Sequence, residues 1–378
     1  MTMSYWKSKN VLVTGGAGFI GSYLVEILLE DGANVTVADN LSRGKMENLA
    51  AVLDGISFRK ADLTYLDQCE EVCSGRDVVM NLASPAFGVE YSTTHHGEML
   101  TDVARIGFNV LDAARRQGVR RFLVVSSSCV YPDDAGVPTK EDQAHRGEPE
   151  TVNAGYGWAK RMVELQGQYY AREYGMEVAI ARPFNAYGPR ESFEQGKSHV
   201  MPALIEKILS GKDPVVVWGS GNQTRSFVHG RDFAMGLKLI TEHYPAADPV
   251  NVGHDRETTI RALAEAVLKI TGSNSTLVFD ATKPEGALRK AADVTKLRKV
   301  THGFVPRITL EEGLGEMIEC FQNACAVDET TRLLDRQNRI STCHCEEAEG
   351  RRGNLNPIEH QRLPRPFRPR NDDSQNHT

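Results

Sequence analysis

Two short stretches of the sequence combine residue types that can transfer protons. Residues 126–132 read SSSCVYP, and residues 156–160 read YGWAK, which places Tyr156 and Lys160 four positions apart. Residues at positions i and i+4 share one face of a helix, so a phenol and an ammonium can converge there. A free tyrosine, with a pKa of about 10, is a poor base at neutral pH, but a nearby positive charge favours the phenolate. The YGWAK stretch therefore predicts a tyrosine that acts as a general base.

The cysteine inside SSSCVYP has two interpretations. Cys129 follows the apolar run Phe122–Val125, which predicts a strand whose end opens onto a site. A thiol at that place is a candidate for proton transfer. A small buried hydrophobic residue is the alternative. The local sequence leaves both interpretations open.

Short apolar runs alternate with helical patterns in the first half of the chain. Strands are expected at residues 11–13, 35–38, 78–82 and 122–125, and helices within residues 21–32, 106–118 and 156–175. Strands that alternate with helices indicate a parallel sheet covered on both faces. The predicted fold class is α/β, a Rossmann-type doubly wound parallel sheet with a smaller C-terminal substrate-binding lobe.

Three glycines lie between the first expected strand and the first expected helix. In VLVTGGAGFIGSYLVE these are Gly15, Gly18 and Gly21, and a second strand follows about 20 residues on. Glycines there permit a tight turn and close approach of a pyrophosphate, and the helix N-terminus supplies amide donors. The stretch predicts a dinucleotide site, and a purely structural glycine turn is the alternative.

A carboxylate at the end of the second strand indicates which dinucleotide is bound. Asp39 can accept hydrogen bonds from the adenosine ribose hydroxyls and would repel a 2′-phosphate, which favours NAD over NADP, although Arg43 lies close by. Asp62 is placed to bond the adenine edge or to serve as an ordinary loop aspartate. The other residues expected to contact the dinucleotide are Phe19, Ile20, Asn40, Leu63, Leu82, Ala83, Tyr156 and Lys160.

The periodic pattern divides the chain into three parts. Residues 1–189 are predicted to form the NAD-binding domain, with segments near residues 225–250 returning to it, and residues 190–325 the substrate-binding lobe. Residues 326–378 have few large apolar residues and many charges, so we expect a disordered tail. Its Cys343-His344-Cys345 run has no second ligand pair at metal-binding spacing, and no metal is predicted.

Composition excludes several classes of protein. The 378 residues are 40% hydrophobic and 25% charged, as in an ordinary globular protein, and the net charge of −6 gives no reason to expect nucleic acid or an anionic membrane as partner. No secretory signal or membrane-spanning run is found. The seven cysteines are odd in number and irregularly spaced, which, without a secretory signal, indicates reduced thiols in a cytoplasm.

From about residue 9 to 322 the sequence resembles the extended short-chain dehydrogenase/reductase family of nucleotide-sugar epimerases and dehydratases. The matching pieces are TGGAGFIG, ADN, ADL, SSSCVYP, YGWAK, RPFNAYGP and RSFVHGRD. The resemblance implies a Rossmann domain that binds NAD(P) and a small C-terminal substrate lobe. It also implies a catalytic triad of Ser127, Tyr156 and Lys160, in which Ser127 shares the hydrogen bond of the substrate hydroxyl.

Within that family, SSSCVYP and SHVMPAL resemble the GDP-mannose 3,5-epimerase and GDP-fucose synthase branch. The resemblance makes Cys129 and His199 a catalytic acid/base pair, with Lys197 a lesser candidate. Oxidation of a sugar at C4 makes the hydrogens at C3 and C5 removable as protons. Inversion then needs one group on each face, and a thiol and an imidazole can share that work near neutral pH.

The same resemblance suggests residues that hold the substrate. Ser128, Asn185, Lys197, Arg225 and Arg289 are the candidates. The planar fork of an arginine bonds phosphate oxygens in pairs, which suits a nucleotide diphosphate. Family members commonly form homodimers through two helices, here those containing GFNVLDAARR and YGWAK.

The favoured function is an NAD-dependent nucleotide-sugar epimerase that oxidises C4 transiently and inverts C3, C5 or both in a GDP-hexose-like substrate. One alternative is a GDP-fucose-synthase-like enzyme that epimerises and then reduces with NADPH. A simple 4-epimerase would leave Cys129 and His199 without a role. A non-catalytic dinucleotide-binding regulator is disfavoured by the intact Ser127, Tyr156 and Lys160.

Overall fold

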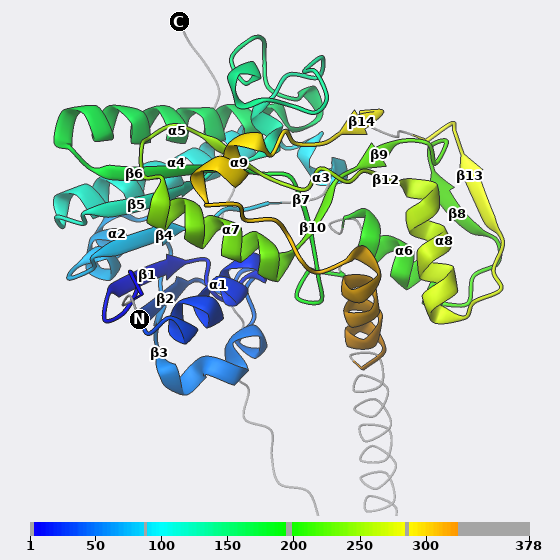
Figure 1. Cartoon of the computed structure of the whole chain (residues 1–378), viewed down its shortest axis with the longest axis horizontal. Coiled ribbons are helices and arrows are strands. Elements are labelled where there is room, and N and C mark those ends of the chain that lie inside the picture. The colour runs from blue at the N-terminus through cyan, green and yellow to red at the C-terminus, as the bar shows by residue number, and fades with distance from the viewer. Residues whose placement is uncertain (1–3, 87–88, 194–198, 284–286, 324–378) are drawn as a thin grey trace, which may run out of the picture. The chain divides into compact units, whose positions relative to one another are not determined.

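The described part of the protein contains every candidate site residue except Lys197. The computed structural model describes residues 4–86, 89–193, 199–283 and 287–323 (Figure 1). Lys197, the predicted tail at 326–378 and the Cys343-His344-Cys345 run lie outside the described residues.

Seven parallel strands form the main sheet, in the order β11-β6-β5-β4-β1-β2-β3. Their bounds are β1 Asn10–Thr14, β2 Asn34–Asp39, β3 Ile56–Lys60, β4 Val78–Asn81, β5 Arg121–Val125, β6 Glu177–Pro183 and β11 Val250–Val252. The four residues of β4 are all buried, as expected for a strand covered on both faces. The predicted fold class is confirmed.

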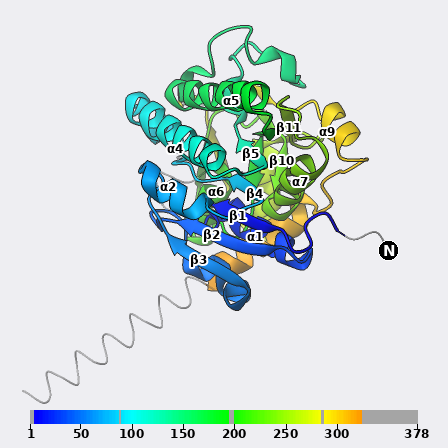
Figure 2. The ribbon, with the colours of Figure 1, turned by 90° about the vertical axis from the view of Figure 1, so that its left-hand side faces the viewer.

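Helices cover both faces of this sheet, as Figure 2 shows. One face packs against α2 (Leu66–Cys73), α4 (His96–Arg116) and α5 (Ala154–Tyr174). The other packs against α1 (Phe19–Glu30), α7 (Gly230–His243) and α9 (Thr295–Val300). Adjacent strand residues point to opposite faces, so Leu12 lies in the first core and Val11 and Val13 in the second.

Three small sheets follow β6 in the chain, and two of them contribute to a separate core. The sheets are β7 (Asn185–Tyr187) with β10 (Phe227–His229), β12 (Thr258–Thr259) with β9 (Thr224–Arg225) and β14 (Arg289–Lys290), and β13 (Leu277–Asp280) with β8 (Val215–Trp218). The core takes residues from the first and the third of these sheets. Helices α6 (Val200–Leu209) and α8 (Ile260–Thr271) and the helical residues 310–323 pack around it.

Helix α8 shows how the sequence builds this region. Its buried residues Ile260, Leu263, Ala264 and Val267 follow the spacing of one helical face. The Thr259 hydroxyl accepts a hydrogen bond from the Ala262 amide at 3.0 Å and begins the helix. Gly272, in the left-handed conformation, ends it.

Short helices and turns complete the described residues. These are α3 (Val89–Ser92) and the 3₁₀ segments η1 (Met46–Gly55), η2 (Ser128–Val130), η3 (Glu141–Gln143) and η4 (Thr151–Asn153). The division at residue 189 stays a prediction, and β11 and α7 lie on the main sheet although they follow that position.

Candidate active site

The glycine-rich turn between β1 and α1 leaves space that only glycine allows. Gly15 has a φ of +65°, and a Cβ there would lie 2.9 Å from the Ala83 backbone nitrogen. A Cβ on Gly21 would lie 2.2 Å from the carbonyl oxygen of Gly15. Helix α1 begins at Phe19 without a side-chain cap on its first amides. These amides and the missing side chains fit a pyrophosphate of a bound dinucleotide.

Asp39 ends β2 beside this turn. Its Oδ2 accepts a hydrogen bond from the Ala17 amide at 3.1 Å, and its Oδ1 accepts one from the Leu41 amide at 2.8 Å. Burial raises the pKa of this carboxyl, and the two amides oppose the rise. Each carboxylate oxygen has capacity for a further bond, so Asp39 can accept from ribose hydroxyls.

The other residues expected at the dinucleotide take varied places. The guanidinium of Arg43 donates to the Ala86 carbonyl, and the side chain of Asn40 accepts from the Ser42 amide at 3.0 Å. Asp62 bonds the Thr64 amide and hydroxyl through Oδ1, at 3.0 and 2.7 Å. Asp62 therefore shapes its own loop while its second oxygen remains for a ligand.

The apolar residues expected to contact the dinucleotide lie partly in the core and partly beside the glycine turn. Leu63 is 4% exposed and belongs to the core under α2 and α4. The Ala83 amide donates to the Thr14 hydroxyl at 3.2 Å, and the Leu82 amide donates to the Thr14 carbonyl at 3.2 Å. Phe19 and Ile20 form the first turn of α1 and pack partly buried against the core.

Tyr156 and Lys160 lie in the first two turns of α5, as the sequence predicts. The Lys160 ammonium donates to the Val125 carbonyl at 2.9 Å and lies 5.4 Å from the centre of the Tyr156 ring. Burial lowers the pKa of Lys160 to about 8, although Cys129 and Glu164 oppose this. The ammonium is thus held at the end of β5, beside the phenol.

Burial is also the strongest influence on Tyr156, whose pKa it raises. The Cys129 thiolate would raise that pKa further, whereas the hydroxyls of Ser84 and Ser127 lower it. The Ser84 hydroxyl meets no hydrogen-bond geometry within the described residues, but it lies close enough to act on the phenol. Tyr156 therefore needs an added positive charge, such as a nicotinamide ring, to act as a base.

Ser127 begins the single turn η2, where its hydroxyl oxygen accepts a hydrogen bond from the Cys129 amide at 3.1 Å. It therefore caps a turn, while its O–H can still donate. Ser126 donates to the Glu164 carboxylate, and Ser128 is 7% exposed. The turn directs Cys129 toward the end of α5 that carries the phenol.

Two residues beside Cys129 were not predicted from the sequence. Glu150 donates its backbone amide to the Cys129 carbonyl at 3.2 Å, and its carboxylate forms an ion pair with Lys290, whose Nζ lies 2.9 Å from Oε2. Burial raises the pKa of Cys129 to about 12, with Lys290 lowering it and Glu150 raising it. No spacing signal connects these positions, because Glu150 and Lys290 are 140 residues apart in the sequence.

His199 immediately precedes α6 and pairs with a second acidic residue. Its Nδ1 contacts the Glu191 carboxylate, and its imidazole is 59% exposed while Glu191 is 7% exposed. Burial favours the neutral ring, but the hydrogen bond and charge of Glu191 outweigh it and raise the pKa of His199. Among the described residues no hydrogen bond or ion pair joins His199 to Cys129.

The predicted substrate-holding residues contact protein groups. Asn185 donates to the Ser226 carbonyl at 3.1 Å. Arg225 donates from Nη1 to the carbonyls of Thr224 and Ala287, each at 2.8 Å. Arg289 forms a two-point ion pair with Glu257, at 3.1 and 2.5 Å. Arg289 would have to leave this carboxylate to bind a phosphate through the same fork.

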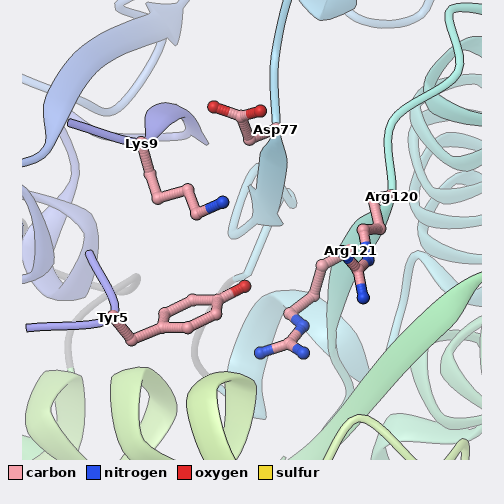
Figure 3. A pocket seen from close by; sticks show the side chains of 5 residues that line it. All are labelled: Tyr5, Lys9, Asp77, Arg120 and Arg121. Carbon is pink, nitrogen blue, oxygen red and sulfur yellow. The ribbon is translucent and has the colours of Figure 1, made fainter. Parts of the chain in front are cut away.

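A separate cavity lies at the opposite edge of the sheet. Its volume is about 180 Å³. Figure 3 shows the side chains that line it, which are Tyr5, Lys9, Asp77, Arg120 and Arg121. These residues lie near the amino ends of β1, β4 and β5, whereas Gly15 and Ser126 follow the carboxyl ends of β1 and β5. Ligands of open α/β sheets bind at the carboxyl ends, so this cavity is no part of the candidate site.

Comparison with protein families agrees with a site for a dinucleotide and a tyrosine base. Residues 11–253 match the model described as the NAD dependent epimerase/dehydratase family. The chain belongs to this family. It is therefore an enzyme of the sugar-nucleotide epimerase/dehydratase class, and the family binds a nicotinamide dinucleotide. No helix among the described residues has the length and apolar character needed to cross a membrane.

Named relatives confirm the predicted branch. The chain is 31% identical over 327 residues to a GDP-L-fucose synthase of Sinorhizobium fredii, which covers 85% of this chain and 98% of that protein. It is 30% identical over 316 residues to GDP-mannose 3,5-epimerase 1 of Oryza sativa subsp. japonica, covering 82% and 81%.

The fold is shared with solved epimerases. The UDP-glucose 4-epimerase of Thermotoga maritima, solved with UDP-glucose, matches with a TM-score of 0.75 at 30% identity, covering 84% of this chain and 99% of that one. The fold of this chain is thus that of a nucleotide-sugar epimerase of known structure.

Proposed function

We propose that this protein is an NAD-dependent nucleotide-sugar epimerase that oxidises C4 transiently and inverts C3, C5 or both in a GDP-hexose. The observation that carries the proposal is the position of Cys129 beside Tyr156 and Lys160, since the thiol acts on the pKa of both. A group able to transfer protons thus adjoins the groups that oxidise the sugar. A simple 4-epimerase would have no use for it.

Asp39 supports NAD as the cofactor. Its carboxylate lies next to the glycine turn and has a free acceptor site on each oxygen, which suits ribose hydroxyls and opposes a 2′-phosphate. When bound, NAD would accept the hydride from C4 and later return it. No net redox change results, so one retained cofactor serves many turnovers.

The oxidation step depends on three side chains. Tyr156 takes the proton of the C4 hydroxyl, and Ser127 donates its O–H to the same sugar oxygen. Lys160, fixed by the Val125 carbonyl, places a positive charge beside the phenol and favours the phenolate. Burial raises the pKa of Tyr156 strongly and so favours the protonated phenol. The positive charge of Lys160 therefore has to act together with that of the bound cofactor.

Epimerisation is assigned to Cys129 and His199. The ketone at C4 makes the protons at C3 and C5 acidic, and inversion requires removal on one face and delivery on the other. Glu191 raises the pKa of His199 and so favours its protonated ring, while burial raises the pKa of Cys129 to about 12 and keeps the thiol protonated near neutral pH. The thiol thus rests as an acid, and whichever group takes a proton from the sugar must first lose its own.

Substrate binding is assigned to the small sheets around β9 and β14. Arg225 and Arg289 supply guanidinium groups for the diphosphate, and Asn185 and Ser128 supply polar groups nearer the sugar. Lys197 remains a prediction from the sequence. The Sinorhizobium relative and the SHVMPAL stretch favour a second candidate, a GDP-fucose-synthase-like enzyme that uses NADPH.

We also propose that the protein forms a homodimer through α4 and α5. Four large apolar side chains on one face of α5 are 40–53% exposed: Trp158, Met162, Leu165 and Tyr169. Their spacing of four, three and four residues makes a continuous stripe. Beside them a groove of about 530 Å³ is also lined by α4 residues, including Phe108. A second copy of the same helix pair would cover this face.

The decisive experiment is incubation with GDP-mannose in deuterated water. The proposal expects deuterium at C3 or C5 without added reductant, and loss of this exchange in Cys129→Ser with dinucleotide binding retained. Interconversion at C4 without deuterium uptake would show a simple 4-epimerase. Consumption of one NADPH per 4-keto sugar would show the reductase.

A further inference from the structure

We propose that Glu150 and Lys290 are positioning residues for Cys129: Glu150 orients the thiol, and Lys290 is the counter-ion of the thiolate. The proposal rests on the proposed function, in which Cys129 exchanges a proton with the sugar. It explains how a thiol buried in this site can exist as an anion during the reaction.

Glu150 and Lys290 form a mostly buried ion pair, and further hydrogen bonds hold Glu150 in place. Lys290 and Glu150 are 19% and 16% exposed, and their ion-pair distance is 2.9 Å. The same oxygen of Glu150 accepts from the side chain of Asn153 at 3.1 Å. The Glu150 amide donates to the Cys129 carbonyl at 3.2 Å. The backbone of Glu150 is therefore fixed to that of Cys129, while its carboxylate is held by Lys290 and Asn153.

The backbone around Lys290 is held on two sides. In β14, Lys290 lies opposite Arg225 of β9 in parallel register, and its carbonyl accepts from the Ser226 amide at 3.3 Å. The next residue, Ala291, accepts from the Thr139 amide at 2.8 Å. These bonds fix β14 beside the candidate substrate residues. The Lys290 ammonium is then held at Glu150, next to the proposed proton-transfer site.

The groups that face the thiol come from four elements. They are Ser127 in the turn, Glu150 in the following loop, Tyr156 and Lys160 on α5, and Lys290 on β14, with Arg225 behind Lys290. Lys290 lowers the pKa of Glu150 despite burial, and the charges of Cys129 and then Glu150 raise the pKa of Lys290 despite burial, so both residues of the pair stay charged at neutral pH. Glu150 disfavours the thiolate, and Lys290 favours it.

The chemical step balances within this arrangement. When Cys129 gives its proton to the sugar carbon, the S–H bond breaks, a C–H bond forms and the electron pair stays on sulfur. The negative charge then faces the Lys290 ammonium. In the reverse direction the thiolate takes a proton from the carbon, and Glu150 then accepts the hydrogen bond of the S–H.

The test measures alkylation of Cys129 by iodoacetamide at pH 8 in the full-length protein without sugar. Trypsin releases residues 122–140, which contain no other cysteine, so mass spectrometry reports this thiol alone. We expect Lys290→Met to slow alkylation and Glu150→Gln to speed it, each by about threefold or more. Loss of a charge within about 4–6 Å shifts a pKa by about one unit or more, and the lower nucleophilicity of a more acidic thiol offsets part of the tenfold change.

Opposite changes in alkylation rate in the two variants distinguish this electrostatic role from a structural one. If the ion pair only ties β14 to the loop, both substitutions expose the thiol and both speed alkylation, and that result overturns the proposal, as do unchanged rates. Lys290→Arg should restore the wild-type rate, and thermal melting confirms that each variant is folded. The deuterium experiment tests the proposed function separately, because thiol reactivity is measured without substrate.

Discussion

Glu164 of α5 and Arg182 of β6 form an ion pair that is almost fully buried. The N–O distance is 2.7 Å, and the side chains are 1% and 2% exposed. The same carboxylate accepts from Ser126, and Arg182 also donates to the Tyr131 hydroxyl at 3.1 Å. The helix that carries Tyr156 and Lys160 is thereby fixed against the strand end that carries Ser127.

Glu164→Gln should therefore destabilise the protein strongly. It removes one charge of a buried pair and leaves Arg182 uncompensated, which typically costs about 3–5 kcal/mol. Urea unfolding followed by circular dichroism would measure the change in free energy of unfolding. Glu173→Gln, at an exposed position on the same helix, should change it by less than about 0.5 kcal/mol. Equal effects of the two substitutions would show that the pair contributes little.

Glu191→Gln should change the pH dependence of epimerisation. Glu191 raises the pKa of His199, so the variant should lose its protonated imidazole at lower pH than wild type. If His199 acts as the acid, activity falls as pH rises through its pKa, and this limb of the profile moves to lower pH. Because the folded pKa is the raised one, the pair also adds stability below about pH 6.5, which disappears as pH rises through the folded value.

Deuterium wash-in between pH 5.5 and 9 would measure that shift. Glu265→Gln, an exposed position on α8, serves as the control and should keep the wild-type profile. A profile that does not move in Glu191→Gln would remove His199 from the rate-determining proton transfer.

Asp39→Ala should reverse the preference between dinucleotides. The substitution removes the acceptors for ribose hydroxyls and the charge that repels a 2′-phosphate, so NADH should bind more weakly and NADPH relatively more tightly. We expect the ratio of the two dissociation constants, measured by fluorescence titration, to change by about tenfold or more, equivalent to about 1.4 kcal/mol. Asp67→Ala on α2 is the control. Tighter binding of NADPH than NADH by the wild type would contradict the cofactor assignment.

The sequence predicted those parts of the site that depend on local spacing. Gly15 and Gly21 were recognisable because a strand, a turn and a helix follow one another, and Tyr156 and Lys160 because a helix brings i and i+4 together. The alternation of strands and helices likewise predicted the parallel sheet. Each of these features is contained within about 30 residues.

Contacts between distant segments could not be predicted in this way. Lys290 reaches Glu150 across 140 positions, because β14 pairs with β9, a two-residue strand without a distinctive pattern. Ser127 was expected to serve catalysis, and nothing in the sequence indicated that its hydroxyl oxygen also accepts a hydrogen bond from the Cys129 amide and begins the turn η2. The burial that raises the pKa of Tyr156 also depends on the packed structure and was not visible in the YGWAK stretch.

Met162→Glu combined with Leu165→Glu should convert the proposed dimer to a monomer. Both side chains lie in the apolar stripe of α5, are 42% and 40% exposed and line the groove beside α4. Two carboxylates on each copy would face the same charges on the other and would have to be desolvated, which opposes association. Light scattering after size-exclusion chromatography would measure the mass. Tyr65→Glu, at a 58% exposed aromatic outside this face, should leave the mass unchanged, and a monomeric wild type would refute the assigned interface.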